Sequence, residues 1–223
     1  MKSKSVGVLL LVTIVSLASL CPTAQANLTY IFKDIITNET NPANATIGEA
    51  QLFVDVLAVT DPLATGDVFF RFRNVGNHAC SITDVYFDDG ALLGISSLVN
   101  GPGVSFSPGA SPPDLPRGNE LDPPFVTTAG FLADSTTPHL QQNGVNPTEW
   151  LEVHFDLLPG KSYGDVIDSL SDGSLRIGIH VQAFPDGGSE SFVNNGVIPA
   201  PGAIALGSIG VVLVGFLRRR RTP

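Results

Sequence analysis

Apolar and polar residues alternate along three short segments of the chain, 68–73, 151–157 and 175–183. Because a two-residue period places neighbouring side chains on opposite faces, each segment predicts a β-strand with one buried face. The polar positions expected to face solvent in the last two segments are Glu152, His154, Asp156, Arg176, His180 and Gln182. Residues 51–59 are apolar on both faces apart from Asp55, which predicts a strand in the centre of a sheet.

Turn residues mark the end of a further strand. Residues 81–87 have strand character, and Asp88-Asp89-Gly90 forms the turn that closes them. Weaker strand patterns lie at 30–36, at 125–131 and near Ser191.

One short helix is predicted at 162–172. Ser162 and Asp165 have the spacing of a helix cap, and Val166, Ile167 and Leu170 would then face the sheet. Asp172-Gly173 is a suitable end for the helix.

These elements together predict an all-β fold, a single antiparallel β-sandwich of jelly-roll or immunoglobulin-like type with one short helix. The domain is placed at 27–190, followed by a polar linker at 191–198. Residues 101–124 contain seven of the 17 prolines and predict a long loop. This loop is either a ligand-binding excursion or a surface insertion, and the insertion is favoured.

The N-terminus has the pattern of a secretory signal peptide. Lys2 and Lys4 precede an uncharged apolar stretch at 6–20, and small residues stand at Ala24 and Ala26. This arrangement predicts a signal peptide over 1–26 that is cleaved after Ala26. An uncleaved anchor is disfavoured because the apolar stretch is shorter than the roughly 20 residues that span a bilayer.

The cysteines agree with cleavage at this point. Lipidation of Cys21 is the alternative, but Leu20 stands where a small residue is needed. Cleavage removes Cys21 and leaves Cys80 alone, so no intramolecular disulfide can form. Cys80 is expected to be a small buried strand residue, because no nucleophile motif surrounds it.

The C-terminus combines prolines, an apolar stretch and a basic cluster. Residues 198–217 are 20 in number and as a helix would span roughly 30 Å, the thickness of a bilayer core. A transmembrane helix is placed at 202–217. The cluster at 218–221 is expected to stay in the cytoplasm while the acidic middle of the chain is exported.

This tail resembles the PEP-CTERM sorting signal of exported bacterial proteins, also known as the ice-binding protein C-terminal motif. The residues that carry the resemblance are Pro199, Ala200, Pro201, Arg218, Arg219, Arg220 and Arg221. They form the Pro-Ala-Pro-Gly-Ala variant, without the central glutamate of the family, and the tail occupies 199–223. The resemblance implies a sorting protease of the exosortase type that recognises the tail, transient membrane anchoring, and delivery to the cell surface or the extracellular space. A plain tail anchor is the alternative, but it has no need of the paired prolines.

The charge distribution argues against one class of partner. All 21 acidic residues and only six of the 12 basic residues lie between 27 and 198, so this segment carries a net charge of −15. Like charges repel, so nucleic acid is excluded as a partner. An acidic surface is compatible with Ca²⁺, which prefers carboxylate and carbonyl oxygens.

No residue pattern in the chain indicates catalysis, a cofactor or a strong metal site. Asp84, Asp88 and Asp89 could gather around Ca²⁺, but they first form a turn signal. The acidic positions of the predicted helix, Asp165, Asp168 and Asp172, are discounted in the same way. Three strand positions form a further metal alternative, Glu152, His154 and Asp156. The four histidines lack zinc-site spacing, and surface or loop positions are expected for His78, His139, His154 and His180.

The function expected from these observations is that of an exported bacterial cell-surface or extracellular-matrix protein. Its β-domain would act as a structural or interaction module, not as an enzyme, with exopolysaccharide as a partner. Two alternatives stay open. A carbohydrate-binding module would expose coplanar aromatic rings, for which Trp150 and Tyr86 are the candidates. A polysaccharide-active hydrolase would need two carboxylates in a groove.

Overall fold

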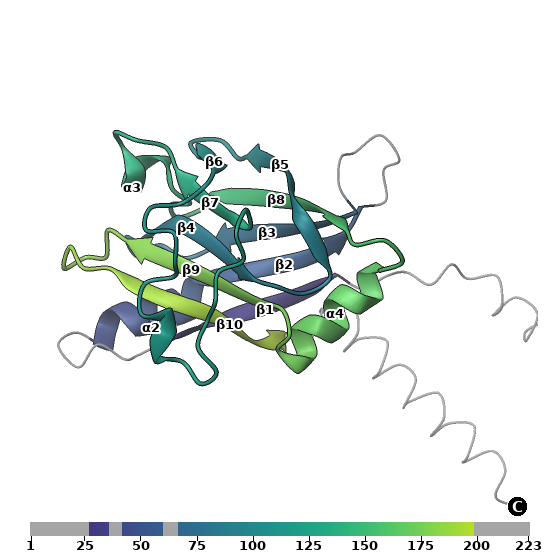
Figure 1. Cartoon of the computed structure of the whole chain (residues 1–223). Coiled ribbons are helices and arrows are strands. Elements are labelled where there is room, and N and C mark those ends of the chain that lie inside the picture. Colours follow the sequence, from purple (N-terminus) through teal and green to yellow (C-terminus); the bar gives the residue numbers. More distant parts are fainter. Residues whose placement is uncertain (1–26, 36–41, 60–66, 199–223) are drawn as a thin grey trace, which may run out of the picture.

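The computed structural model describes residues 27–35, 42–59 and 67–198. The predicted signal peptide, the transmembrane helix and the sorting tail lie outside these residues. The strands are β1 (Leu28–Asp34), β2 (Leu52–Ala58), β3 (Val68–Asn74), β4 (Ser81–Asp88), β5 (Leu92–Asn100), β6 (Phe106–Pro108), β7 (Leu132–Ser135), β8 (Trp150–Leu157), β9 (Arg176–Gln182) and β10 (Glu190–Ile198). The helices are α2 (Pro42–Gln51), the 3₁₀ helix η1 (Gly118–Glu120), α3 (Leu140–Asn143) and α4 (Tyr163–Asp172) (Figure 1).

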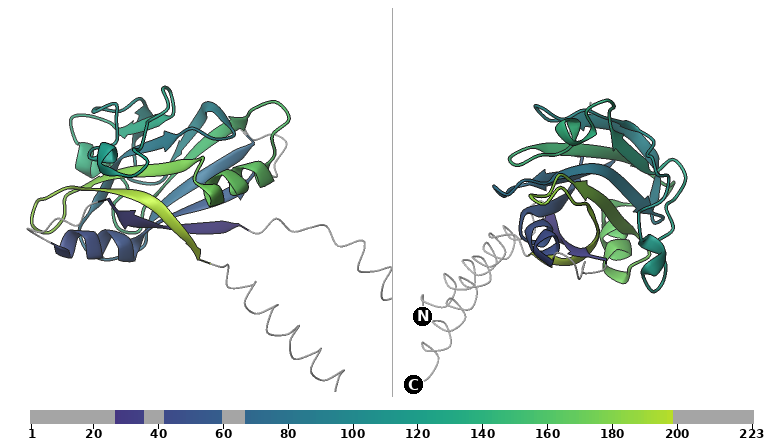
Figure 2. Two further views of the ribbon diagram at one scale, coloured as in Figure 1. Left: turned by 60° about the horizontal axis from the view of Figure 1, so that its bottom comes forward. Right: turned by 90° about the vertical axis from the view of Figure 1, so that its left-hand side faces the viewer.

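The ten strands form one antiparallel sheet in the order β5-β8-β3-β2-β1-β10-β9-β4-β7-β6. The sheet curls strongly, so that its two edge strands approach each other (Figure 2). The Asn100 side chain joins these edges: its Oδ1 accepts from the Phe106 amide at 2.9 Å, and its Nδ2 donates to the Phe106 carbonyl at 3.3 Å. One amide side chain therefore replaces a backbone ladder where the sheet nearly closes.

The inside of the curled sheet is filled by the apolar positions of the alternating strands. Edge-to-face aromatic contacts lie at its centre, with Phe87 at 5.1 Å from Phe70 and 4.7 Å from Phe155, measured between ring centroids. Such pairs add about 0.5–1.5 kcal/mol beyond the burial of their surface. The inward positions predicted in 68–73, 151–157 and 175–183 are confirmed as buried, except that Leu157 is half-buried and that Ala183 lies beyond the end of β9.

The all-β antiparallel prediction is confirmed, but the two separate sheets of a sandwich are not what the described residues form. Residues 191–198, predicted as a linker, belong to β10, which hydrogen-bonds to β1 on one side and to β9 on the other. This strand joins five strands on one side to four on the other. The weak strand pattern near Ser191 is confirmed as the start of β10, but Asn194, Asn195 and Gly196 interrupt the apolar alternation that would have predicted the rest.

Helix α4 is the helix predicted from the sequence. The Ser162 side chain accepts from the Asp165 amide, and the Asp165 carboxylate accepts from the Ser162 amide, which makes a full capping box. Val166 and Leu170 are buried against the sheet. Gly173 follows the helix with φ 80°, the left-handed conformation that ends many helices.

Helix α2 was not predicted, because its sequence has almost no apolar stripe. It is held instead by close packing and by polar contacts to other elements. A Cβ on Gly48 would lie 2.2 Å from Cζ of Phe192, so only glycine lets the helix approach β10 this closely. The Asn44 amide donates to the Asp186 carboxylate at 3.1 Å.

The stretch at 101–124 is mostly loop, as predicted, and contains only β6 and η1. Part of it covers the outer face of β4 and β9. Leu115 and Phe125 pack on Tyr86 there, and Leu115 closes over Gly178, where a Cβ would lie 2.6 Å from its Cδ2. The predicted strand at 125–131 is wrong: these residues form no strand, and Phe125 and Phe131 are buried from loop positions.

The two ends of the described domain lie side by side. Thr29 at the start of β1 pairs with Ile198 at the end of β10. Both lie at the end of the domain that carries α4, whereas α2 and α3 lie at the opposite end (Figures 1 and 2). We call the α2–α3 end, with the β9–β10 turn at 183–189, the distal end.

Candidate functional site

The predicted solvent face of β8 is covered by other side chains. Glu152 and His154 are each only 8% exposed, so their prediction as solvent-facing is wrong. Nε2 of His154 lies 3.0 Å from Oε2 of Glu152, and Arg71 on β3 donates through Nε and Nη2 to Oε1 of the same carboxylate. Both carboxylate oxygens are thus occupied, and Asp156 lies exposed beyond them. This arrangement is a cross-strand ion pair and not a set of converging metal ligands.

Aromatic rings on this outer face are used within the protein. Phe69 stacks on His154 with centroids 5.0 Å apart, and the Arg71 guanidinium lies over the rings of Phe69 and Trp150 at 5.8 and 5.5 Å. Sugar-binding platforms need an open ring face. Trp150 is half-buried with Arg71 on its face, and Tyr86 is fully buried with its hydroxyl donating to the Pro112 carbonyl at 3.1 Å. The expectation that Tyr86 is an outward aromatic is therefore wrong.

The three aspartates proposed for Ca²⁺ are separated. Asp88 pairs with Arg176 on β9, and Asp89 occupies the turn with φ 45°. Asp84 lies in the middle of β4, where its Oδ2 is 3.0 Å from Nδ1 of His180. No common site brings their carboxylates together.

Asp84 instead belongs to a row across β7, β4 and β9. It stands opposite Asp134 on one side and opposite His180 on the other. Burial and the neighbouring Asp84 carboxylate raise the pKa of Asp134 to about 6. Sequence reasoning missed this pair because Asp84 and Asp134 are 50 residues apart in the chain. Asp84 is 2% exposed and lies in none of the three hollows described below.

Cys80 and the remaining histidines have the positions expected of structural residues. Cys80 is buried, and burial raises the pKa of its thiol, which opposes formation of the nucleophilic thiolate. The Gln51 amide donates to its Sγ at 3.0 Å. His78 and His139 are exposed, as predicted.

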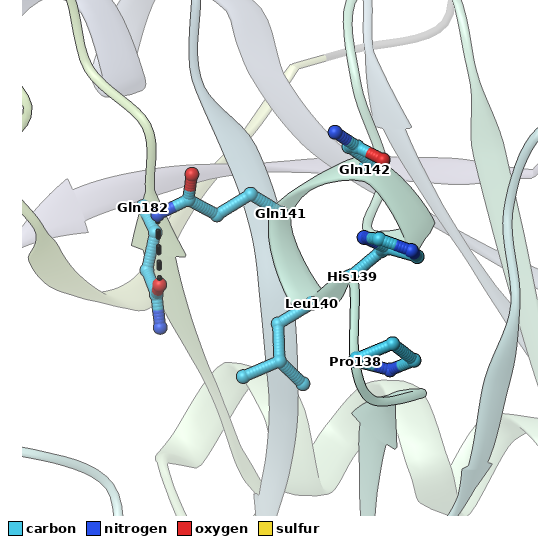
Figure 3. Close-up of a pocket in the computed structure, with 6 residues that line it drawn as sticks. All are labelled: Pro138, His139, Leu140, Gln141, Gln142 and Gln182. Atoms are coloured by element: carbon cyan, nitrogen blue, oxygen red, sulfur yellow. Dashed lines mark hydrogen bonds between the residues drawn. The ribbon is translucent and has the colours of Figure 1, made fainter.

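A hollow of about 300 Å³ lies at the distal end, between α3 and the end of β9. Figure 3 shows its lining, in which the Gln141 side chain reaches toward Gln182 and donates to its Oε1 at 3.4 Å. Pro138 and Leu140 supply apolar surface, and His139 lies next to Pro138 in the lining (Figure 3). Three glutamines and one histidine offer both donors and acceptors to a ligand, and the volume is at the lower limit of small-molecule sites.

Two other hollows lie near α4. One of about 410 Å³ is formed by the end of α4 and by β10, and includes Tyr30 and Asp172. The other, of about 230 Å³, lies between the β4–β5 turn and Lys161. Among the residues that the structure describes, no three or more His, Cys, Asp or Glu side chains form a metal-binding group, and no helix is long and apolar enough to cross a membrane.

Comparison of the chain with protein-family models, with characterised proteins and with solved structures finds no match.

The basic residues of the domain are all neutralised by carboxylates. The pairs are Lys33–Glu49, Arg71–Glu152, Arg73–Asp55, Arg117–Glu120, Lys161–Asp165 and Arg176–Asp88. Because these are the six basic residues between 27 and 198, the other 15 acidic residues there have no basic residue left to balance them. The domain therefore presents an anionic field to its partners.

Proposed function

We propose that this chain is an exported bacterial cell-surface protein whose β-domain serves as an interaction module. The signal peptide at 1–26 directs export. The tail at 199–223, with Pro199, Pro201 and the arginines 218–221, directs sorting by a protease of the exosortase type, with transient anchoring through the helix at 202–217.

The pairing of the chain ends is the observation that best supports this proposal. Because Thr29 pairs with Ile198, the segments that precede and follow the domain leave it at one end. Once the signal peptide is removed, the membrane-anchored tail holds the domain by that end alone. The distal end, with α2, α3 and the hollow in Figure 3, then faces away from the membrane.

The hollow at the distal end supports exopolysaccharide as the partner. The side chains of Gln141, Gln142 and Gln182 both donate and accept hydrogen bonds, as sugar hydroxyls do. Pro138 and Leu140 offer the apolar contact that the ring face of a sugar needs. The aromatic-platform alternative has less support because Arg71 covers the Trp150 ring. The hydrolase alternative has less support because Asp84, one member of the Asp84–Asp134 pair, is buried.

The sorting proposal is tested with the chain in its native host. We expect the mature protein at the cell surface to begin at Asn27 and to lack the arginines 218–221, as measured by mass spectrometry of both ends. Replacing Pro199 and Pro201 by Ala should increase the membrane-retained, unprocessed fraction about tenfold, whereas the tail control Thr222→Ala should process normally. A surface form that keeps Met1, or a double variant processed like the wild type, contradicts the proposal.

A further inference from the structure

Two carboxylates point into the distal end of the curled sheet beneath α2. Asp34 ends β1 on the same face as buried Phe32, and it stands opposite Phe192 of β10. Glu190 lies two residues before Phe192 and so shares its inward face. Diagonal neighbours of this kind lie roughly 7–8 Å apart in an antiparallel pair, within reach of their side chains.

These two carboxylates lack the partners that a buried charge requires. Asp34 is 9% exposed and Glu190 is 6% exposed. Both carboxylate oxygens of Asp34 and Oε1 of Glu190 are inaccessible to solvent and make no hydrogen bond. The ionised form of a carboxylate buried in this way is strongly disfavoured unless a positive charge or hydrogen-bond donors accompany it.

The charged groups around Asp34 and Glu190 do not supply the missing positive charge. Glu49 on α2 adds a third carboxylate, and its Oε1 is occupied by the Asp34 amide at 3.2 Å and by Nζ of Lys33 at 2.6 Å. Arg117 from the 109–124 loop is bonded to Glu120 and lies exposed. Burial, Glu190 and Glu49 together raise the pKa of Asp34 to about 6, and Arg117 and Lys33 offset this only in part.

We propose that Asp34 on β1 and Glu190 on β10 together bind a Ca²⁺ ion beneath α2. Ca²⁺ is a hard cation that takes carboxylate oxygens, and it supplies the positive charge that these two carboxylates lack. Asp34 and Glu190 serve as its carboxylate ligands, because Oε1 of Glu49 is occupied by the Asp34 amide and by Lys33. Water and backbone carbonyls supply the remaining ligands. The bound ion would tie β1 to β10 beneath α2. The proposed Ca²⁺ site is independent of the sorting route.

The test is a Ca²⁺ titration of the full chain, purified in detergent and stripped of metal with a chelator. At pH 7.5, 10 mM CaCl₂ should raise the Tm by about 3 °C, as expected for a site with a Kd on the order of 1 mM. Asp34→Asn and Glu190→Gln should each abolish this shift. Asp168→Asn removes an equal charge from an exposed position on α4 and should keep it.

Proton competition provides a second readout. At pH 5, where Asp34 is largely protonated, the Tm shift caused by Ca²⁺ in the wild type should fall by more than half. A wild type that does not respond to 10 mM Ca²⁺ at pH 7.5 overturns the proposal. So does an Asp34→Asn variant that folds and responds like the wild type, or an Asp168→Asn variant that loses the shift equally, since general screening would then explain the effect.

Discussion

Buried carboxylates are the residues whose charge state this fold changes most. Asp34 and Asp134 both have a pKa raised to about 6, the first by burial with Glu190 and Glu49 nearby, the second by burial beside Asp84. Both shifts arise from contacts between segments far apart in the sequence. The stability of the domain is therefore expected to depend on pH through these two groups.

The direction of this dependence follows from the sign of the shifts. Each folded-state pKa exceeds the unfolded value of 3.8, so the folded protein binds more protons between about pH 4 and pH 6. The metal-free domain should be most stable on the acidic side of this window and lose stability as the pH rises through 6. The exposed Asp165 and Asp172, whose pKa values are lowered, titrate below this window.

We expect the free energy of unfolding to fall by about 1 kcal/mol per group between pH 4.5 and pH 7.5, after allowance for solvent screening. Urea denaturation in the presence of a chelator measures this change. Asp134→Asn should flatten the pH profile, whereas the exposed control Asp156→Asn should leave it unchanged. Stability that increases from pH 4.5 to pH 7.5 would show that other groups dominate.

At the scale of elements, α4 depends on its first turn. The capping box between Ser162 and Asp165 satisfies backbone amides that the helix cannot satisfy itself. Helix α2 has no comparable local signal and depends on Gly48 and on the Asn44 contact with Asp186. This difference explains why one ten-residue helix was predicted from the sequence and the other was not.

Ser162→Ala should lower the free energy of unfolding by about 1 kcal/mol, because the Asp165 amide loses its acceptor. Thermal or urea denaturation measures the loss. Ser189→Ala, at an exposed position in the β9–β10 turn, is the matched control and should change stability by less than about 0.5 kcal/mol. Equal losses in the two variants would assign no special role to the cap.

At the scale of the whole molecule, closure of the sheet depends on one side chain. Asn100 at the end of β5 makes both hydrogen bonds to the Phe106 backbone where the two edges meet. On the opposite side of the sheet, β10 pairs by backbone ladders with β1 over six residues and with β9 over four. The link between β5 and β6 through Asn100 is thus weaker than the ladders that β10 makes.

Asn100→Ala should cost about 1–2 kcal/mol of stability, because it removes two hydrogen bonds and leaves the Phe106 amide without a partner. It should also speed hydrogen exchange at 106–108 more than elsewhere in the sheet. Asn77→Ala, in the exposed turn after β3, provides the control. Exchange that increases evenly over all strands would contradict a local role in closure.

Local pattern was sufficient to predict the elements with regular alternation. Strands β3, β8 and β9, the central strand β2 and helix α4 were found because each repeats a pattern or carries a cap within ten residues. Only the start of β10 was indicated, by the weak strand pattern near Ser191, because Asn194, Asn195 and Gly196 interrupt the apolar alternation in the rest. Residues 125–131 have strand composition but pack as loop against β4.

The sequence by itself determined the β class of the domain, its anionic charge and the two terminal signals that predict export and sorting, because these depend on local composition. Only the tertiary structure decided that Glu152 is occupied by Arg71 and His154, that Asp84 meets Asp134, and that Asp34 and Glu190 are buried near each other. Each of these sites joins residues of different strands. Their burial and their pKa values depend on how the sheet curls, which no short segment of the chain encodes.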